Sequence, residues 1–312
     1  MIDLKRLDSI DRSLVARALG LPEDSPAEGL FGPYRQYRVD ASHGQEKTPD
    51  IYFPAHAKVE LDYDERQLIR EGSKGPQVKR IQEHLVLLGK KITIDGDFGP
   101  ATARALKGVI VGEGGLYSPL APVVTKQLWD DVLTEKMRGV IMARPTMPNG
   151  STLTDWVHEI AQTHLDAHPV EVGGQNRGPW VRLYMDGHEG ASWPWCAGFV
   201  TYVLRQVAAL RREDPLLPGS FSCDVLAARG KAAGKFVKGP VPAADPRERE
   251  RGFIFLVRKS ANDWTHTGFG FDLQTNGTFR TIEGNTNDEG SREGYEVCSR
   301  VRSSRNMDFI LL

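Results

Sequence analysis

One cysteine in this chain of 312 residues is placed for nucleophilic chemistry. Cys196 follows Trp193-Pro-Trp195 and precedes a helical pattern with a buried stripe at Val200, Val203, Leu204 and Val207. The proline predicts a helix start, which puts Cys196 in the first turn. Unpaired backbone N–H groups there carry about half a positive charge, which stabilises a thiolate. They could also receive the oxyanion of a tetrahedral intermediate. Cys196 is therefore the candidate nucleophile.

A thiolate nucleophile needs a proton partner, and His266 is the one histidine of eight that follows Cys196. It lies in a strand-like run, residues 265–271, in which Gly268 and Gly270 share its face. Two glycines beside a histidine predict open space, as a substrate groove requires, whereas a core histidine usually has bulky neighbours. The pattern favours a catalytic role for His266.

Glu283 and Asn285 are the candidates for orienting the imidazole of His266. Both follow Asn276-Gly277, the strongest short hairpin signal, and both share the His266 face in the predicted register. A two-residue turn would place Asn285 opposite Gly268 and Glu283 opposite Gly270, with Asn285 nearer His266. A bulge would shift this register, so spacing alone leaves the choice open.

The other cysteines and histidines are predicted to be structural. Cys223 stands near a possible helix start without a recognisable site around it, and Cys298 is expected in the core of a late strand. Three cysteines without a CxxC pair indicate neither a disulfide framework nor a zinc site. His158 and His164 are six positions apart and share no helix face, so with His168 we expect solvated or capping roles. We expect no metal and no cofactor.

Composition and charge narrow the class of protein. A hydrophobic content of 40% and a charged content of 26% fit a soluble globular chain. The net charge of −1 argues against nucleic acid or anionic lipid as partners, and no run approaches the ~20 apolar residues of a membrane span. The N-terminus lacks the apolar core of a secretion signal. An extracytoplasmic target would then need another route, such as release through a phage holin or a secretion machine.

Two copies of a GxxGP pattern, Gly72–Pro76 and Gly96–Pro100, introduce a predicted helical segment. Each proline lies just inside a helix start. A third helical stretch holds Leu128, Trp129, Val132 and Leu133. Three short helices predict a small all-α domain over 61–142.

The remaining boundaries follow from composition. Residues 1–60 are expected to be an N-terminal extension or small subdomain, and the Pro-, Gly-, Ser- and Thr-rich stretch 143–154 a linker. The segment 155–312 places helices near 153–164 and after Cys196 before strand-like runs at 252–257, 265–271 and 278–282. This order predicts an α+β fold.

The C-terminal motifs are similar to those of a known enzyme family. Glu171-Val-Gly-Gly-Gln-Asn-Arg-Gly-Pro, Trp195-Cys-Ala-Gly-Phe-Val, Thr265-His-Thr-Gly-Phe-Gly and Ile282-Glu-Gly-Asn-Thr-Asn resemble the CHAP branch of the NlpC/P60-type cysteine peptidases. The resemblance covers about 150–305. It implies a papain-like α+β fold, with Cys196 as nucleophile, His266 as base and acid, Glu283 as orienting residue and Asn285 as a further polar member. We rank Glu283 first because a carboxylate better stabilises the imidazolium.

The chain departs from the family pattern in two places. Arg251-Gly252 stands where Gly-Asp is usual before the first strand, and Cys196 follows Trp195 rather than a small or amide residue. A second oxyanion donor is therefore unassigned, and Gln175 or Asn176 could supply it. Trp193 and Trp195 flank the nucleophile and could line a substrate groove, whereas Trp180 is expected in the core.

A second resemblance concerns the helical segment. Residues 66–106, with Arg70-Glu-Gly-Ser-Lys-Gly-Pro and Ile94-Asp-Gly-Asp-Phe-Gly-Pro, are similar to the helical peptidoglycan-binding domain of cell-wall enzymes. Together the two resemblances imply an endolysin-like monomer that cleaves peptidoglycan amide bonds, at the sugar–peptide junction or within the stem and bridge peptides. Two alternatives remain: a wall-binding protein with a degenerate catalytic domain, and a transpeptidase or acyltransferase of the same fold.

Overall fold

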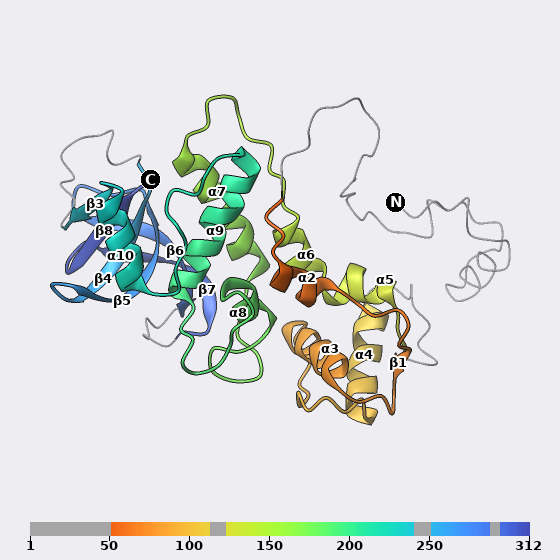
Figure 1. Cartoon of the computed structure of the whole chain (residues 1–312). Helices are drawn as coiled ribbons and strands as arrows, with labels where there is room; N and C mark the ends of the chain where they lie inside the picture. Colours follow the sequence, from red (N-terminus) through yellow and green to blue (C-terminus); the bar gives the residue numbers. More distant parts are fainter. Residues whose placement is uncertain (1–50, 113–122, 240–250, 288–293) are drawn as a thin grey trace.

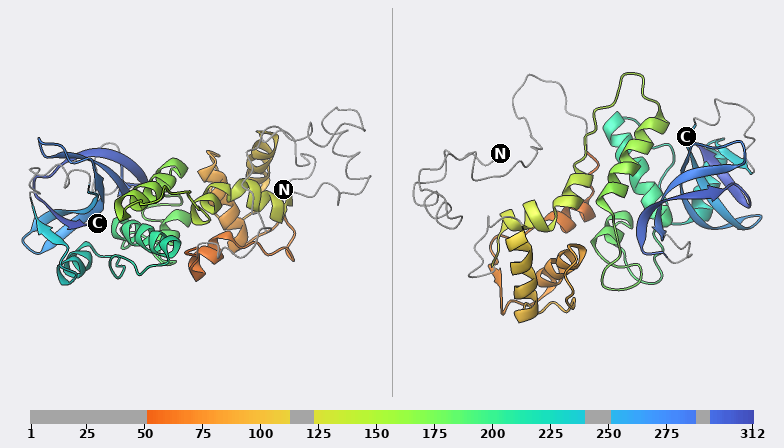
Figure 2. Two further views of the ribbon diagram at one scale, coloured as in Figure 1. Left: turned by 90° about the horizontal axis from the view of Figure 1, so that it is seen from above. Right: turned by 180° about the vertical axis from the view of Figure 1, so that it is seen from behind.

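The computed structural model describes residues 51–112, 123–239, 251–287 and 294–312. A mixed α+β architecture results, with a β-sheet, a layer of helices and a small helical segment arranged in a row (Figures 1 and 2). The predicted α+β fold class is confirmed as a mixture of helices and strands. Within these residues no helix combines the length and apolar character that a membrane span requires. Most of the predicted N-terminal extension, residues 1–50, lies outside the described residues.

The helical segment is built on the two proline-started helices. α3 (Pro76–Leu87) and α4 (Pro100–Gly112) begin at the two GxxGP prolines. The third stretch forms a short helix, α5 (Lys126–Leu128), that continues into a π-helical turn, η3 (Trp129–Leu133). β1 (Ile69–Arg70) and β2 (Val123–Val124) form a small antiparallel pair beside them. One hydrophobic core, running from Tyr63 to Leu133, holds these elements together.

Five helices form the helical layer, in which α7 and α9 pack on the sheet. These are α2 (Ala55–Leu61), α6 (Glu135–Ile141), α7 (Leu153–Ala167), α8 (Pro179–Tyr184) and α9 (Cys196–Arg211). α7 starts at a capping box formed by Thr152 and Asp155, which satisfies two backbone donors reciprocally. α9 is the central helix: it is buried along nearly its whole length and packs on β5 and β6.

The sheet has six antiparallel strands in the order β3-β8-β4-β5-β6-β7. Its members are β3 (Phe236–Lys238), β4 (Phe253–Ser260), β5 (Asp263–Phe271), β6 (Thr278–Thr286), β7 (Glu296–Ser303) and β8 (Met307–Leu311). The three strands expected from the sequence are β4, β5 and β6. α10 (Cys223–Ala232) contacts β5 and β3.

The first half of β4 is buried on both faces of the sheet. Ile254 and Leu256 of β4 belong to the large core that includes α9, whereas Phe253 and Phe255 belong to a smaller, aromatic core with Phe279 and Phe309. The alternation of β4 therefore separates two cores, as a strand covered on both sides requires.

The cores do not follow the domain boundaries expected from composition. Ala57 and Leu61 of α2, with Met137, Val140 and Ile141 of α6, pack in the large core of the α+β segment. The predicted boundary at 142 thus cuts through this core, because the helical core already ends at Leu133. Residues 143–152 contain no helix or strand, and α7 begins at Leu153.

A buried polar network joins α7 and α8 to α9. His164 of α7 is fully buried, and its ring nitrogens contact the hydroxyl of Tyr184 at 2.8 Å and Oε1 of Gln206 at 3.0 Å. Burial lowers the pKa of His164 to about 4, so the ring is neutral at pH 7. The expected solvated or capping role of His164 is wrong, because Ile160 and Ala161, four and three residues before it, are buried and place it on the core side of α7. His168 does cap this helix, in a left-handed conformation.

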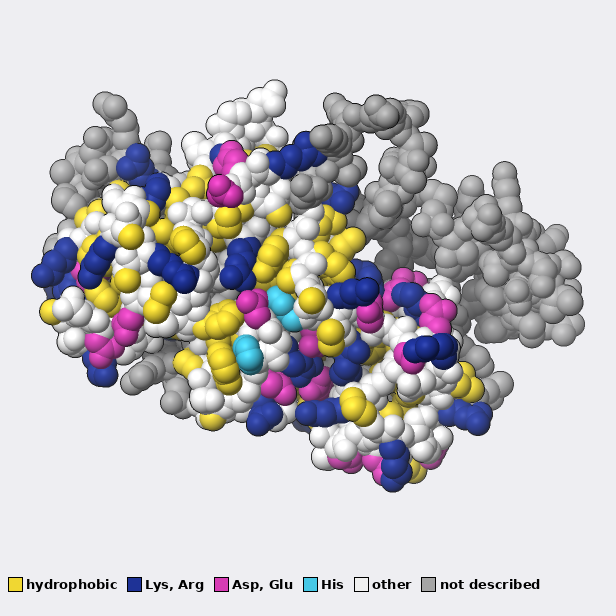
Figure 3. Space-filling view, viewed as in Figure 1, with side chains coloured by type: hydrophobic (Ala, Val, Ile, Leu, Met, Phe, Trp, Pro, Cys, Tyr) yellow, Lys and Arg dark blue, Asp and Glu magenta, His cyan; other side chains and the backbone are white. Residues whose placement is uncertain are grey.

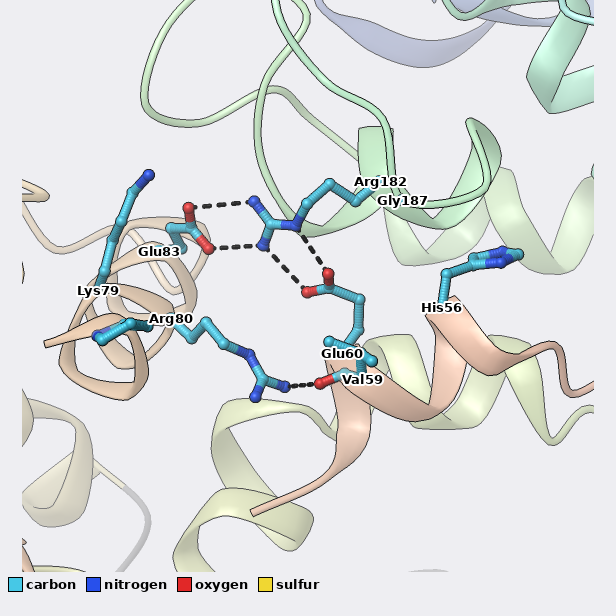
Figure 4. Close-up of a pocket in the computed structure, with 9 residues that line it drawn as sticks. His56, Val59, Glu60, Lys79, Arg80, Glu83, Arg182 and Gly187 are labelled. Atoms are coloured by element: carbon cyan, nitrogen blue, oxygen red, sulfur yellow. Dashed lines mark hydrogen bonds and ion pairs between the residues drawn. The ribbon is translucent and has the colours of Figure 1, made fainter. Parts of the chain in front are cut away.

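Arg182 joins the helical segment to the α+β segment (Figure 4). Its guanidinium donates to both carboxylate oxygens of Glu60 on α2 and both of Glu83 on α3, at 2.7–3.2 Å. It also donates to Glu189, at 2.8 Å. Glu60 and Glu83 are each 3% exposed, so their charges rely on Arg182. On the face seen in Figure 3, acidic and basic side chains are interspersed over the described part of the chain.

We expect Arg182→Gln to lower the free energy of unfolding by about 3–5 kcal/mol, because it removes the guanidinium that hydrogen-bonds both buried carboxylates and leaves only the more distant charge interaction with Arg80. Denaturant titration of the full chain measures this. Arg177→Gln is the control: that side chain is about half exposed and pairs with Glu189 at 3.5 Å, so we expect a loss within about 1 kcal/mol. Equal losses in the two variants would contradict a central role for Arg182.

Candidate active site

Cys196 is the first residue of α9, as the sequence predicts. The helix start has no side-chain cap, so the N–H groups of its first turn keep their positive end toward the sulfur. The Cys196 side chain hydrogen-bonds the ring of His266 and the backbone amide of Thr267, both on β5. The nucleophile candidate and the proton partner are therefore in direct contact.

His266 is held in turn by a buried carboxylate. Its Nε2 donates to Oε2 of Glu283 at 2.8 Å. Glu283 is fully buried and accepts two further hydrogen bonds from Arg302 of β7, at 2.5 and 2.6 Å, and one from the hydroxyl of Thr281. The chain of contacts runs from Arg302 through Glu283 and His266 to Cys196.

The hydrogen bond from His266 selects Glu283 over Asn285, and the hairpin register shows how the two residues are placed. Phe269 pairs with Ile282 and Gly270 with Thr281, so Glu283 comes level with Gly268 and next to His266. The partner of Gly268 therefore lies two residues earlier in β6 than predicted. The turn is longer than the two residues expected: the N–H of Gly277 donates to the carbonyl of Gln274, and the N–H of Gln274 donates to the carbonyl of Thr278. Continued without a break, this register would set Asn285 opposite His266. The prediction that Asn285 lies nearer the ring fails because β6 becomes irregular after Glu283, whose carboxylate takes the hydrogen bond from His266.

Asn285 lies where the ladder between β6 and β7 becomes irregular. It adopts a left-handed conformation, with φ of 56°, within the register shift that follows Glu283. Its side chain is buried, and its Oδ1 has no hydrogen-bond partner within the described residues. The bulge therefore removes Asn285 from the regular alternation that placed it on the His266 face.

The two glycines beside His266 do not open a groove, contrary to expectation. A Cβ on Gly268 would meet Phe255 at 2.9 Å and Glu283 at 3.0 Å, and a Cβ on Gly270 would meet the ring of Phe253 at 2.2 Å. The glycines instead admit phenyl rings from β4. Cys196 is 4% and His266 8% exposed. Two surface hollows, of about 270 and 490 Å³, are lined by neither residue.

Charge favours a thiolate–imidazolium pair at this site. A hydrogen bond from the thiol of Cys223 and contacts with His266 hold the pKa of Cys196 well below its usual range, although burial opposes this. Burial disfavours the charged ring, yet hydrogen bonds to Cys196 and Glu283 raise the pKa of His266 to about 9. Because folding raises this pKa, the contribution of His266 to stability is complete below pH 6.5 and is lost as the pH rises through 9.

Cys223 is the unexpected member of the site. It begins α10, and its Sγ lies 3.8 Å from Sγ of Cys196. Hydrogen bonding to Cys196 and burial raise the pKa of Cys223 well above its usual value, so Cys223 is the donor of this pair. The expectation that no site surrounds Cys223 is wrong, because the approach of α10 to α9 depends on tertiary packing. A structural rather than nucleophilic role for this thiol stays a prediction.

The aromatic candidates separate into core and surface. Trp195 is fully buried, stacks on Tyr184 and donates its Nε1 to Glu171 at 2.8 Å, so it anchors the start of α9 and lines no groove. Trp193 is half-buried, stacks on His188 and lies 6.3 Å from the ring of Phe221. Trp180 is in the core, as expected.

Gln175 and Asn176 were candidates for an oxyanion donor. The amide of Asn176 is buried and donates to the carbonyl of Ala191 at 3.3 Å, and its backbone N–H donates to Glu171. Asn176 thus orders its own loop. Gln175 is exposed on the same loop.

Sequence reasoning missed Arg302, Thr281, Cys223 and the anchoring role of Glu171. The β7 run has the period of a strand, which could have placed Arg302 on the Glu283 face; its partner depends on long-range register. No cluster of three or more metal-ligating side chains occurs in the described ranges. Comparisons with protein-family models, curated proteins and solved structures returned no match.

The ion pair predicts how alkylation of Cys196 depends on pH. We expect the rate of its reaction with iodoacetamide to stay nearly constant from pH 6.5 to 9, because the sulfur is already a thiolate there. A free cysteine, with a pKa of about 8.5, gains roughly tenfold per pH unit over the lower part of this range. Peptide mapping after timed alkylation gives the rate at Cys196. A profile like that of free cysteine would exclude the ion pair.

Glu283→Gln removes the carboxylate that holds the His266 proton and leaves Arg302 close to the ring. We expect the pKa of His266 to fall by at least about 1, and with it the upper pH limit of the flat alkylation profile. An NMR titration of the ring measures the shift. Asn285→Ala should leave this pKa nearly unchanged. A comparable shift in both variants would return Asn285 to the orienting role.

Proposed function

We propose that this protein is a cysteine peptidoglycan hydrolase that cleaves amide bonds through an acyl-enzyme intermediate. The observation that carries the proposal is the buried chain Cys196–His266–Glu283, with the cysteine at an uncapped helix start. The order of these residues and their motifs resemble CHAP-type peptidases. A papain-like arrangement, with the nucleophile on a helix and the histidine on a sheet, is part of this proposal.

In this proposal each group of the site carries out one step. The thiolate of Cys196 attacks the amide carbonyl carbon, and N–H groups in the first turn of α9 stabilise the oxyanion. His266, protonated in the resting pair, gives its proton to the leaving amine. The neutral ring then takes a proton from water, which attacks the thioester and restores the cysteine. Glu283 keeps the imidazolium oriented and balanced in charge throughout.

In this proposal the helical segment binds the peptidoglycan. Its two GxxGP helix starts resemble those of peptidoglycan-binding domains. Arg182 ties α3 of this segment to α8, which leads toward the loop before Cys196. Trp193, half-buried three residues before the nucleophile, is the candidate for contact with the substrate.

Burial of the nucleophile favours a second candidate function. With Cys196 4% exposed, a protein that binds the wall without cleaving it also accounts for the helical segment. The two candidates differ in one measurable respect, the release of soluble wall fragments.

Purified cell walls provide the test. We expect the wild type to lower wall turbidity and release muropeptides, and Cys196→Ala to lower both rates by several orders of magnitude because no other group forms the thioester. Cys298→Ala, which also removes a buried thiol, is the control and should retain the activity. Mass spectrometry of the fragments identifies the scissile bond from its new termini.

Each alternative outcome is distinct. Equal activity of the wild type and Cys196→Ala would exclude the thiol mechanism. Sedimentation of the wild type with walls, without release of fragments, would support the binding protein instead.

A further inference from the structure

Two thiols meet at the candidate site from different helices. Cys196 and Cys223 are 27 residues apart in the chain, yet their sulfurs lie 3.8 Å apart. Each is the first residue of its helix, and both side chains are buried. A disulfide places its sulfurs ~2.05 Å apart, so bonding requires a closure of under about 2 Å.

The elements that carry the thiols are held in place independently. Asp224, next to Cys223, accepts a hydrogen bond from the backbone of Trp264 on β5 at 2.8 Å, which ties α10 to the strand of His266. Ser222 caps the same helix start. The loop before it packs against the loop before Cys196 through Phe221 and Trp193. The proximity of the sulfurs therefore follows from ordered contacts on both sides.

We propose that Cys196 and Cys223 form a reversible disulfide when the protein meets a peroxide, with Cys223 as the resolving thiol. The disulfide withdraws the candidate nucleophile and protects it from irreversible oxidation. Its effect on wall cleavage rests on the proposed function, whereas the crosslink itself does not.

The first step is oxidation of Cys196. Its thiolate attacks one oxygen of hydrogen peroxide, an S–O bond forms and the O–O bond breaks. The hydroxide that leaves takes a proton from the imidazolium of His266 and departs as water. Cys196 is now a sulfenic acid, oxidised by two electrons. Its low pKa suits it to this step.

The second step forms the crosslink. The sulfur of Cys223 attacks the sulfur of Cys196, an S–S bond forms and the S–O bond breaks. The hydroxide displaced takes up the thiol proton of Cys223 and leaves as a second water. Two thiols and one peroxide thus give one disulfide and two waters. Because Cys223 is the protonated partner, it is spared in the first step.

Peptide mapping of the full chain tests the proposal. The reduced protein is treated with hydrogen peroxide, alkylated with N-ethylmaleimide and digested without reductant. In the wild type we expect a crosslinked pair of peptides that contain residues 196 and 223, which dithiothreitol returns to free thiols. Cys298→Ala, the matched control, should form the same crosslink.

Cys223→Ser separates two roles of Cys223: the hydrogen bond to the Cys196 thiolate and the attack on the oxidised sulfur. Serine keeps an O–H donor near the thiolate but lacks the second sulfur. We expect this variant to form no crosslink and its Cys196 to proceed to sulfinic and sulfonic acids, which dithiothreitol does not reverse. Cys223→Ala repeats the test, and circular dichroism establishes that both variants are folded.

The proposal is overturned if the wild type accumulates sulfinic acid at Cys196 without a crosslink, or if Cys223→Ser recovers its thiol as completely as the wild type. Wall cleavage is measured separately, before oxidation, after it and after reduction. A crosslink in a protein that never cleaves walls would count against the proposed function and leave the thiol pair standing.

Discussion

The fully buried carboxylate of Glu283 is the charge on which the candidate site depends. A lone carboxylate would be driven to its neutral form in such surroundings, and here Arg302, Thr281 and His266 satisfy its oxygens instead. The carboxylate keeps His266 protonated, and the imidazolium with the start of α9 keeps Cys196 ionised. Three neighbouring strands and one helix start thus share a single electrostatic arrangement.

The local sequence pattern was enough to find the helix and the strand that carry Cys196 and His266. The proline before Cys196 marks the start of α9, and the run around His266 is β5. The sequence could not set how those elements meet. The Asn276-Gly277 signal lies in the right turn, but the turn is longer than two residues, which moved Glu283 into the place expected for Asn285. Arg302 and Cys223 belong to β7 and α10, whose packing no local period encodes.

The glycines beside His266 in β5 fit both an open groove and close packing by larger side chains. A missing side chain leaves room, and sequence alone does not say what fills it. At Gly268 the room is taken by Phe255 and by the Cγ of Glu283, so the absent Cβ lets the carboxylate approach His266. The sulfur-bearing side chain of Cys196 is also nearly buried. Under the proposed function, a wall strand reaches Cys196 only after side chains above the pair move aside.

Arg182 and the large core join elements that precede the linker to the α+β segment that follows it. Two of the carboxylate partners of Arg182 come from α2 and α3, and the large core includes α6, so elements before residue 143 complete the α+β segment. A fragment that starts at the linker would lack these partners and would leave the apolar faces that meet Met137, Val140 and Ile141 open to water. Proteolytic trimming at that linker would therefore yield an aggregation-prone, short-lived remnant rather than an independently folded domain.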